Sequence, residues 1–224
     1  LQARYDITTN VVEVHGETYA MQHPRDAESL IDEAAFNHDE RLPYWADIWP
    51  SAIALAQAVR PLDGNCLSLL ELGCGSGLVT AAALRAGFDV TATDYYEDAL
   101  SFTRLNARLN AAREPNTMLL DWRDLPDAID AFDVVVAADV LYERSYGPII
   151  ARAIAPQLSE ALKQTVVIEN KAGANGNTGT DMVAKANDGH TLLLCDVGAL
   201  AITASVYGKL PFDPSKDLRG VTML

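Results

Sequence analysis

The sequence predicts an α/β protein with a doubly wound, mostly parallel sheet, and two stretches support this prediction. An apolar run that ends at Leu72 is followed by the glycine turn GCGSG at 73–77, a helix of small residues, and a second apolar run that ends at Asp94. This order of strand, turn, helix and strand is that of one βαβ unit. Residues 132–138 are almost continuously apolar, as expected of a central strand in a parallel sheet.

The segments before this unit predict a hairpin and two helices. Alternating residues around Gly16 indicate a strand or a hairpin. Residues 26–36 have helical apolar spacing with acidic residues near the start, which predicts a surface helix. Pro50 and Ser51 can open a helix that runs to Val59 and packs its apolar face on the sheet.

The segments after the unit continue the alternation of helices and strands. Residues 97–110 carry the apolar stripe of a helix, and 117–120 predict a third strand. In the last third of the chain the pattern predicts strands at 165–169 and 191–195, with a helix at 178–186 between them. We therefore expect atypical C-terminal strands that complete or extend the sheet.

Composition and charge narrow the class of protein. The chain has 224 residues, of which 49% are hydrophobic and 21% charged, as in one globular domain with or without a further fragment. Its formal net charge of −14 argues against a nucleic-acid partner and favours a basic protein or a cationic small molecule. The sequence contains nothing that decides the oligomeric state.

Other sequence signals concern location and metal binding. No apolar stretch is long enough to cross a membrane, and the first ten residues lack a signal pattern. We therefore expect a cytoplasmic protein with no membrane partner. The three cysteines form no C-x-x-C pair and the four histidines show no ligand spacing, which argues against disulfides and against a metal site.

The composition changes abruptly along the chain. Residues 1–156 contain eleven arginines and no lysine, whereas residues 157–224 contain five lysines and one arginine. Such a shift suggests two parts of different origin. The boundary lies near 155–159, inside a segment that predicts one helix, so it is not an ordinary flexible linker.

The glycine turn has the chemistry of a nucleoside site. Glycines let the backbone approach a ligand closely, and the next helix points its N-terminus at the same place. Asp94, at the end of the following strand, can accept both hydroxyls of a ribose. The turn lacks the second spacer residue of the dinucleotide pattern G-x-G-x-x-G, and Glu71 just before it would repel a pyrophosphate. These features favour a cationic nucleoside without phosphates.

Two motifs together carry a resemblance to a known family. ELGCGSG followed by ATDYYEDAL resembles the cofactor motifs of class I methyltransferases, which use S-adenosylmethionine and have a Rossmann-like fold. The resemblance implies that the first acid and the glycines lie against the methionine moiety and that the next motif holds the ribose. The residues concerned are Glu71, Gly73, Gly75, Gly77, Asp94 and Tyr95. The alternative is a glycine turn in another Rossmann-like sheet.

Two further segments are similar to one branch of that family. The block WPSAIALA, which begins at Trp49, resembles a block of the seven-strand protein-lysine methyltransferases related to the enzymes that modify valosin-containing protein and electron-transfer flavoprotein. There the aromatic residue lies beside the cofactor, and an acid and an aromatic after the third strand, here Asp121 and Trp122, meet the adenine. The alternatives are a packing role for Trp49, which we favour for Trp45, and a plain surface turn at 121–122.

The D-x-x-Y sequence after residues 132–138 matches a signature of the same branch. Asp139 and Tyr142 stand where the resemblance implies residues that orient the acceptor amine. The alternative is a capping aspartate and a packed tyrosine.

The last part of the chain is similar to a different family. VVIENKAGANGNTGTD, DGHTLLL and LPFDPSKDL resemble segments of the periplasmic receptors of tripartite tricarboxylate transport. In that family the loop that corresponds to 173–179 helps bind a small carboxylate through backbone amides. The first strand and the whole second domain of such receptors have no counterpart here, so we do not expect this part to hold a ligand well.

These observations lead to one main hypothesis and two alternatives. The main hypothesis is an S-adenosylmethionine-dependent methyltransferase core at 1–156 that methylates an exposed lysine of a protein, joined to a receptor-like fragment at 157–224. The first alternative is a fragment that binds a small carboxylate. The second is a chimeric chain that binds the cofactor without catalysis.

Overall fold

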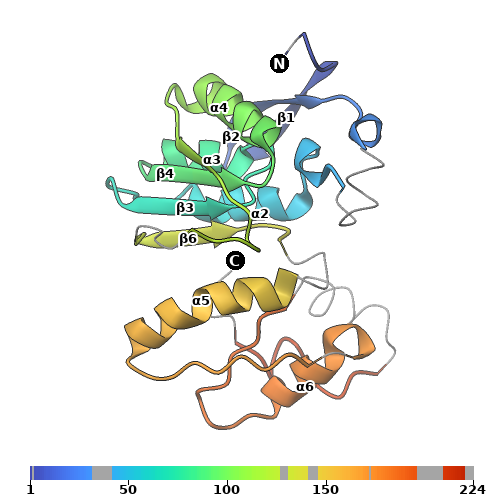
Figure 1. Ribbon diagram of the computed structural model, residues 1–224, viewed down its shortest axis with the longest axis vertical. Helices are drawn as coiled ribbons and strands as arrows, with labels where there is room; N and C mark the ends of the chain where they lie inside the picture. The colour runs from blue at the N-terminus through green and yellow to red at the C-terminus, as the bar shows by residue number, and fades with distance from the viewer. Residues whose placement is uncertain are drawn as a thin grey trace. The chain divides into compact units, whose positions relative to one another are not determined.

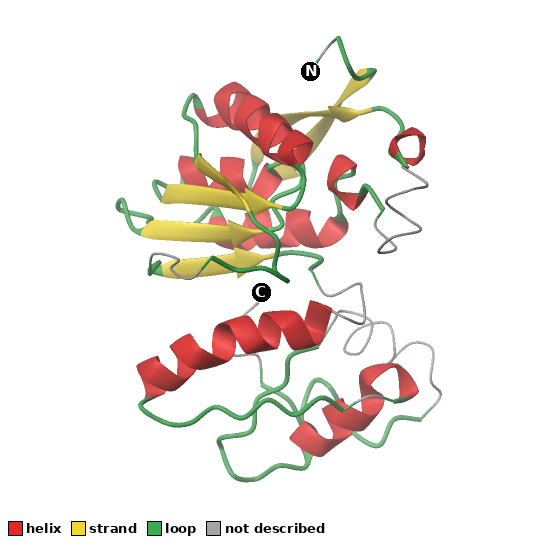
Figure 2. Cartoon of the chain, viewed as in Figure 1, coloured by secondary structure: helices red, strands yellow, loops and turns green. Residues whose placement is uncertain are grey.

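The computed structural model describes residues 1, 3–31, 42–126, 131–140, 146–171, 173–195 and 209–219. By its internal contacts the chain forms two compact units, one over Leu1–Asp139 and the other over Val140–Thr222. Figure 1 shows the course of the chain, and Figure 2 shows that the strands belong to the first unit. The two units are described separately below.

A four-stranded parallel sheet forms the centre of the first unit. Its strands are β3 (Ser68–Leu72), β4 (Asp89–Asp94), β5 (Asn116–Leu119) and β6 (Val134–Ala137), in the order β5-β4-β3-β6. Leu70 of β3 pairs with Thr91 on one side and Val135 on the other. The chain moves outward from β3 to β5 and then returns to place β6 on the other side of β3. This reversal confirms the predicted Rossmann-like α/β fold.

Three helices cover this sheet. They are α2 (Pro50–Val59), α3 (Leu78–Arg85) and α4 (Glu97–Ala111), and α3 packs against both of the others. The crossovers through α3 and α4 both lead toward β5, so right-handed connections place these two helices on the same face. The fully buried alanines 81–83 let α3 lie close to its neighbours. The predicted helix start at Pro50 is confirmed, since Pro50 lies in the first turn of α2.

The N-terminal segment is the expected hairpin. β1 (Ile7–Val14) and β2 (Glu17–Pro24) are antiparallel and joined at His15 and Gly16, both of which have positive φ. Two positive φ angles give the turn a twist that matches paired strands. The hairpin packs on α2 and α4, and its side chains Val14 and Tyr19 enter the same core as α3 and the sheet.

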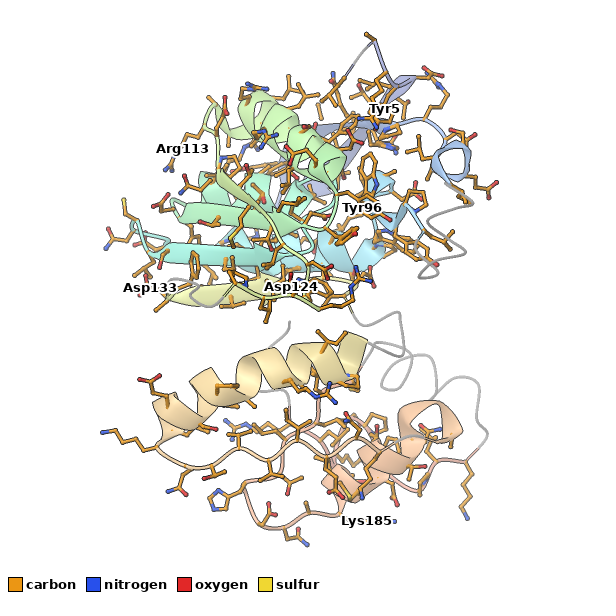
Figure 3. All side chains as sticks on the ribbon, in the orientation of Figure 1. Tyr5, Tyr96, Arg113, Asp124, Asp133 and Lys185 are labelled. Atoms are coloured by element: carbon orange, nitrogen blue, oxygen red, sulfur yellow. The ribbon has the colours of Figure 1, made fainter. Side chains whose placement is uncertain are left out.

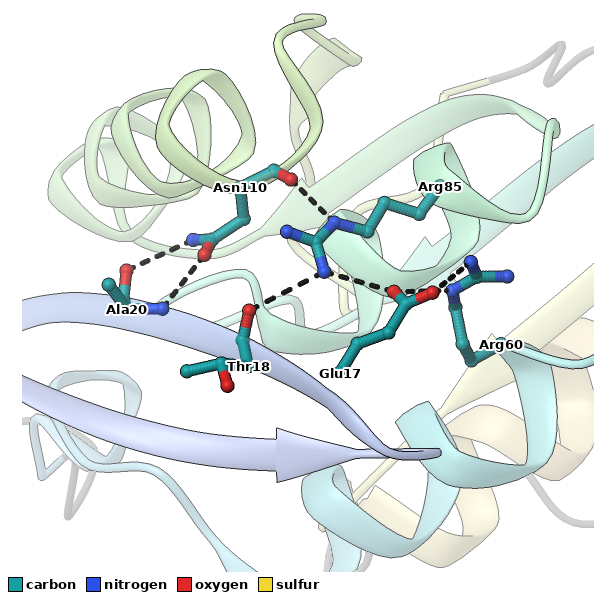
Figure 4. A network of polar contacts seen from close by, with 6 residues as sticks. All are labelled: Glu17, Thr18, Ala20, Arg60, Arg85 and Asn110. Carbon is teal, nitrogen blue, oxygen red and sulfur yellow. Dashed lines mark hydrogen bonds and ion pairs between the residues drawn. The ribbon is translucent and has the colours of Figure 1, made fainter.

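Ion pairs also fasten the hairpin to the helices (Figure 4). Glu17 at the start of β2 pairs with Arg60, which follows α2, and with Arg85 of α3. The guanidinium of Arg85 also lies over the ring of Tyr19, 4.1 Å from its centroid. These contacts join one end of the hairpin to two helices.

Short 3-10 turns occupy the segment before α2. They are η1 (Glu28–Leu30) and η2 (Tyr44–Ala46). Of the helix predicted at 26–36, only the part up to residue 31 lies within the described residues, and there a single 3-10 turn forms.

The second unit contains helices and irregular segments. Its elements are α5 (Tyr146–Leu162), η3 (Ala174–Gly176) and α6 (Asn177–Ala184), so the helix predicted at 178–186 is confirmed. The strands predicted at 165–169 and 191–195 are wrong, because neither segment pairs with another strand. β-branched residues favour a strand only when a partner accepts its backbone hydrogen bonds, and Val167 is instead 81% exposed.

The two compact units do not divide where the composition changes. Contacts separate the chain at 139/140, whereas the shift from arginine to lysine falls near Pro156, inside α5. The division into a core at 1–156 and a fragment at 157–224 therefore stays a prediction about origin. Over the residues that the structure describes, no helix is long and apolar enough to cross a membrane.

Candidate functional site

The carboxyl ends of the four parallel strands bring the predicted site residues to one edge of the sheet. The glycine turn follows β3, Asp94 ends β4, Asp121 follows β5, and Asp139 follows β6. The amide of Leu120 donates to the carbonyl of Asp94 (2.9 Å), which keeps the chain after β5 beside β4. This edge, next to the reversal of strand order, is where open α/β sheets bind ligands.

The glycine turn has a conformation that requires its glycines. Gly73, Gly75 and Gly77 have φ angles of 68°, 53° and 85°, in the left-handed region. A Cβ at Gly77 would lie 2.7 Å from the Cα of Thr103 in α4, which is too close for any side chain. The carbonyl of Trp45 would lie 3.3 Å from a Cβ at Gly75. The turn is therefore enclosed by α4 and η2.

Asp94 holds this turn in place. Its carboxylate accepts hydrogen bonds from the amide of Gly75 (2.9 Å) and the amide of Tyr96 (3.0 Å). Asp94 is 7% exposed, and burial raises the pKa of its carboxyl to about 6. Two amides leave further lone pairs on the two oxygens. Asp94 can thus anchor the turn and still accept hydroxyl groups.

Glu71 lies deeper than the sequence suggested. The residue is 3% exposed, and its carboxyl accepts a hydrogen bond from the Thr80 hydroxyl of α3. Burial, together with repulsion from Asp94, raises the pKa of this carboxyl to about 8. Glu71 is thus mostly protonated at neutral pH, so its expected repulsion of a pyrophosphate is weaker than its formal charge implies.

The two carboxyls determine which ligand fits this edge. Among the described residues, their partners are a hydroxyl and backbone amides, and no basic side chain contacts either of them. A pyrophosphate would need a positive charge in contact with these two carboxyls, where the described residues place none. A cationic nucleoside would instead bring the missing charge and could leave both carboxyls ionised.

The two tryptophans before α2 have different surroundings. Trp45 is buried against Tyr5, Phe102 and Tyr96, which confirms the packing role expected for it; Figure 3 labels Tyr5 and Tyr96. Trp49 caps α2, is 38% exposed, and donates from its indole nitrogen to the Tyr44 carbonyl (2.9 Å). Its predicted place beside a cofactor stays a prediction.

A basic residue that the sequence did not single out joins the predicted adenine side. Arg123 donates from Nη2 to Asp121 (2.7 Å), and its guanidinium lies 5.4 Å from the ring centroid of Tyr95. The guanidinium therefore connects the ends of β4 and β5. Asp121 and Trp122 are half-buried, and the partner of Asp121 reduces its charge toward any ligand.

Asp139 follows β6 and contacts the start of α2. Its φ angle is 53°, a left-handed conformation that aspartate tolerates better than most residues. Its exposed carboxylate accepts a hydrogen bond from the Ser51 hydroxyl in the first turn of α2. The sequence pattern placed Ser51 only at the start of a helix and did not predict this contact. Tyr142, the predicted partner of Asp139, lies outside the described residues.

Comparison with protein-family models identifies the first part of the chain. The model described as lysine methyltransferase matches residues 35–178, which is more than half of the chain. The chain belongs to the lysine methyltransferase family. The match includes the glycine turn, Asp94, Asp121 and Asp139, so the family assignment and the edge of the sheet concern the same residues.

Similar proteins that are themselves protein-lysine methyltransferases support this family assignment. The protein-lysine methyltransferase METTL21E of Mus musculus is 31% identical over 118 residues, which are 46% of this chain and 47% of the relative. Protein N-lysine methyltransferase METTL21A of Xenopus tropicalis is 31% identical over 104 residues, or 43% and 47% of the two chains. The chain thus spans less than half the length of these relatives.

The C-terminal part matches a second family. The model described as tripartite tricarboxylate transporter family receptor matches residues 150–224. Protein BugT of Bordetella pertussis is 44% identical over 78 residues, which are 34% of this chain and 24% of that protein. Both resemblances predicted from the sequence are therefore confirmed, and the two matches overlap at 150–178.

A solved structure was also compared. The tRNA (uracil-54, C5)-methyltransferase of Pyrococcus abyssi, in complex with S-adenosyl-L-homocysteine, aligns with a TM-score of 0.44 at 17% identity, over 67% of this chain and 32% of that one.

Replacing Gly77 tests how tightly the turn is enclosed. We expect Gly77→Ala to lower the free energy of unfolding by about 3 kcal/mol, because the new Cβ combines a strained φ with a collision against the backbone of α4. Gly16→Ala is the matched control, since Gly16 also has positive φ (77°) but has no atom within 4 Å of a Cβ. We expect the control to cost about 1 kcal/mol. Equal losses in urea denaturation would contradict the close approach of α4.

The buried carboxyl of Glu71 predicts a pH dependence of stability. Its pKa is about 8 in the folded chain and near 4.5 when unfolded, so the folded chain keeps a proton that the unfolded chain has lost. Stability from this group is therefore complete below pH 4.5 and is lost as pH rises to about 8, by up to about 1.4 kcal/mol per pH unit.

Glu71→Gln should remove this slope, because the amide cannot ionise and still accepts the Thr80 bond. The pKa of Asp94 is about 6 in the folded chain, so Asp94 changes the stability little above that pH. The slopes of stability against pH are therefore compared for the variant and the parent chain by urea denaturation between pH 6.5 and 7.5. Parallel slopes for the variant and the parent chain would show that Glu71 is ionised in the fold.

Proposed function

We propose that this chain is an S-adenosylmethionine-dependent methyltransferase whose acceptor is a lysine side chain of a protein. The observation that carries the proposal is the buried Asp94 carboxylate, bonded to the amide of Gly75 at an edge with no basic partner for it among the described residues. Membership of the lysine methyltransferase family and the protein-lysine methyltransferases among the relatives support it.

The edge of the sheet supplies groups suited to each part of this cofactor. Asp94 would accept the ribose hydroxyls, and Glu71 with the glycine turn would lie against the methionine moiety. Trp49, Asp121 and Trp122 would line the adenine side, with Tyr95 next to Asp94. When bound, S-adenosylmethionine supplies an electrophilic methyl group on a cationic sulfur. The acidic character of Glu71 and Asp94 suits that positive charge.

The acceptor amine needs an acidic group and a fixed position. Methyl transfer requires the neutral amine about 3 Å from the methyl carbon, so the enzyme must attract the ammonium and then favour loss of its proton. Asp139 would attract the ammonium, and its bond from Ser51 fixes the carboxylate at the start of α2. Tyr142 would orient the amine beside it. The net charge of −14 suits a lysine-bearing partner.

The receptor-like part supports a different function less well. This chain spans only 24% of BugT, and the described residues of 157–224 form no strand. We therefore treat binding of a small carboxylate as an outcome to be tested beside cofactor binding.

Cofactor binding is measured by titration calorimetry with S-adenosylhomocysteine and S-adenosylmethionine. We expect both to release or absorb heat with the parent chain, and Asp94→Ala to abolish the signal because the variant loses the anchor of the turn and the ribose acceptor together. Asp133→Ala is the control, because Asp133 binds Ser68 at the opposite edge of the sheet, where β6 begins. Figure 3 labels Asp133 at this edge. Binding of citrate alone would contradict the proposal and favour the receptor-like function.

Methyl transfer is tested by labelling. We expect a lysate incubated with the chain and methyl-labelled S-adenosylmethionine to gain label on protein lysines. Asp139→Asn should lower the labelling rate at least about tenfold without changing the dissociation constant of S-adenosylhomocysteine, because the amide still accepts the Ser51 bond but no longer attracts an ammonium. Cofactor binding by the parent chain without any labelled protein would show a chain that binds the cofactor and does not catalyse.

A further inference from the structure

The face of α4 that meets the hairpin is polar although it is buried. Asn106 is fully buried and Asn110 is 8% exposed, and the two lie one turn apart on the helix. Asparagine is a poor helix former, and its buried amide is costly unless all its groups are bonded. Two such residues in one helix therefore indicate specific partners.

The side chain of Asn110 binds backbone groups of the hairpin and of its own helix, and Figure 4 shows its two bonds to Ala20. Its Oδ1 accepts from the amide of Ala20 (2.8 Å), and its Nδ2 donates to the carbonyl of Ala20 (3.0 Å) and to the carbonyl of Asn106 (2.9 Å). The side chain thus pairs with β2 as a neighbouring strand would. We call this two-bond arrangement the amide clamp.

Asn106 makes the same amide clamp one turn earlier and adds a contact. Its Oδ1 accepts from the amide of Gln22 (2.8 Å), and its Nδ2 donates to the carbonyl of Gln22 (2.7 Å). The same Nδ2 also donates to the carbonyl of Ser76 in the glycine turn (2.8 Å). One side chain therefore connects the N-terminal hairpin to the turn.

A second residue of α4 binds the neighbouring carbonyl of the turn. The Thr103 hydroxyl donates to the carbonyl of Gly75 (3.0 Å). Two consecutive carbonyls, of Gly75 and Ser76, thus point toward α4. In a planar trans peptide the next amide points the opposite way, so α4 sets the direction of the amides that follow these carbonyls. On the other side of the turn, the amide of Gly75 meets Asp94.

We propose that Asn106 is a positioning residue for the glycine turn. Through Asn106, the N-terminal hairpin helps to hold the turn in the conformation that binds the cofactor. This inference rests on the proposed function for its ligand. The hairpin at 7–24 precedes the residues 35–178 that the lysine methyltransferase model matches. The hairpin would thus contribute to the site through the bonds that join Gln22 to Asn106 and Asn106 to Ser76.

The pair Asn106→Ala and Asn110→Ala separates positioning from stability. Each variant removes one amide clamp from β2, so both should lower the melting temperature by similar amounts. Only Asn106→Ala frees the carbonyl of Ser76. We expect it to weaken S-adenosylhomocysteine binding about tenfold, and Asn110→Ala to change it less than about threefold. Equal changes in the dissociation constant would overturn the proposal.

Two variants of Thr103 separate the hydrogen bond from packing, because Thr103→Val keeps the side-chain volume and Thr103→Ser keeps the hydroxyl. Thr103→Val removes the donor to Gly75 and should weaken S-adenosylhomocysteine binding, whereas Thr103→Ser keeps a hydroxyl and should restore it. This pair remains informative if Asn106→Ala fails to fold. Unchanged binding by the Val variant together with weak binding by the Ser variant would show that packing, and not the hydrogen bond from α4, positions the turn.

A measurement without ligand distinguishes failure of this inference from failure of the proposed function. Amide hydrogen exchange at 74–77 should be faster in Asn106→Ala than in Asn110→Ala, because only the first variant releases the turn. If the parent chain binds no S-adenosylhomocysteine but the turn shows this difference, the proposed function is wrong and the hairpin still orders the turn. Unchanged exchange in both variants would overturn the inference itself.

Discussion

The hydrogen bond between the amide of Gly75 and the buried carboxylate of Asp94 is the contact on which the site depends. It joins the turn after β3 to the end of β4, so the two parts of the proposed cofactor site are held together directly. The bond is possible because parallel strands end at one edge and because glycine permits the φ of 53° at Gly75. Burial strengthens the bond and also raises the pKa of Asp94 to about 6. Burial of the Asp94 carboxylate is thus a cost to folding, and it is also the reason that this carboxylate would attract a cationic ligand.

The sheet, α4 and the hairpin pack around this contact and hold the short glycine turn in its conformation. The sheet supports it from β3 and β4, and α4 binds its carbonyls through Thr103 and Asn106. The hairpin lies against α4 and is fastened to α2 and α3 through Glu17. Small side chains in α3 allow these layers to share one core, which includes Val14 of the hairpin and Leu69 of the sheet. The N-terminal segment is therefore structurally continuous with the site.

The chain carries two family matches that overlap at residues 150–178. The overlap includes most of α5, where the arginine-rich composition gives way to lysine. A helix makes most of its backbone hydrogen bonds between residues four apart, so a junction inside it depends little on distant segments, although Pro156 of α5 lacks the amide hydrogen for one of these bonds. The segments after it keep the receptor-like sequence, but the described residues there do not form strands. A strand needs a paired neighbour, and the described residues of these segments pair with no other strand.

The sequence by itself determined the βαβ unit, the glycine turn, the hairpin at Gly16 and both family resemblances, because period, glycine placement and short motifs are local properties of the chain. Tertiary structure alone decided the contacts between distant segments. The hydrogen-bonded pair Asn106 and Gln22 is 84 residues apart in the sequence. The pair Ser51 and Asp139 is 88 residues apart. No local sequence pattern predicts either contact. The protonation of Glu71 also depends on burial, which brings it beside Thr80 and Asp94. For the same reason the tail misled prediction, since β-branched residues specify a strand only when the fold supplies its neighbour.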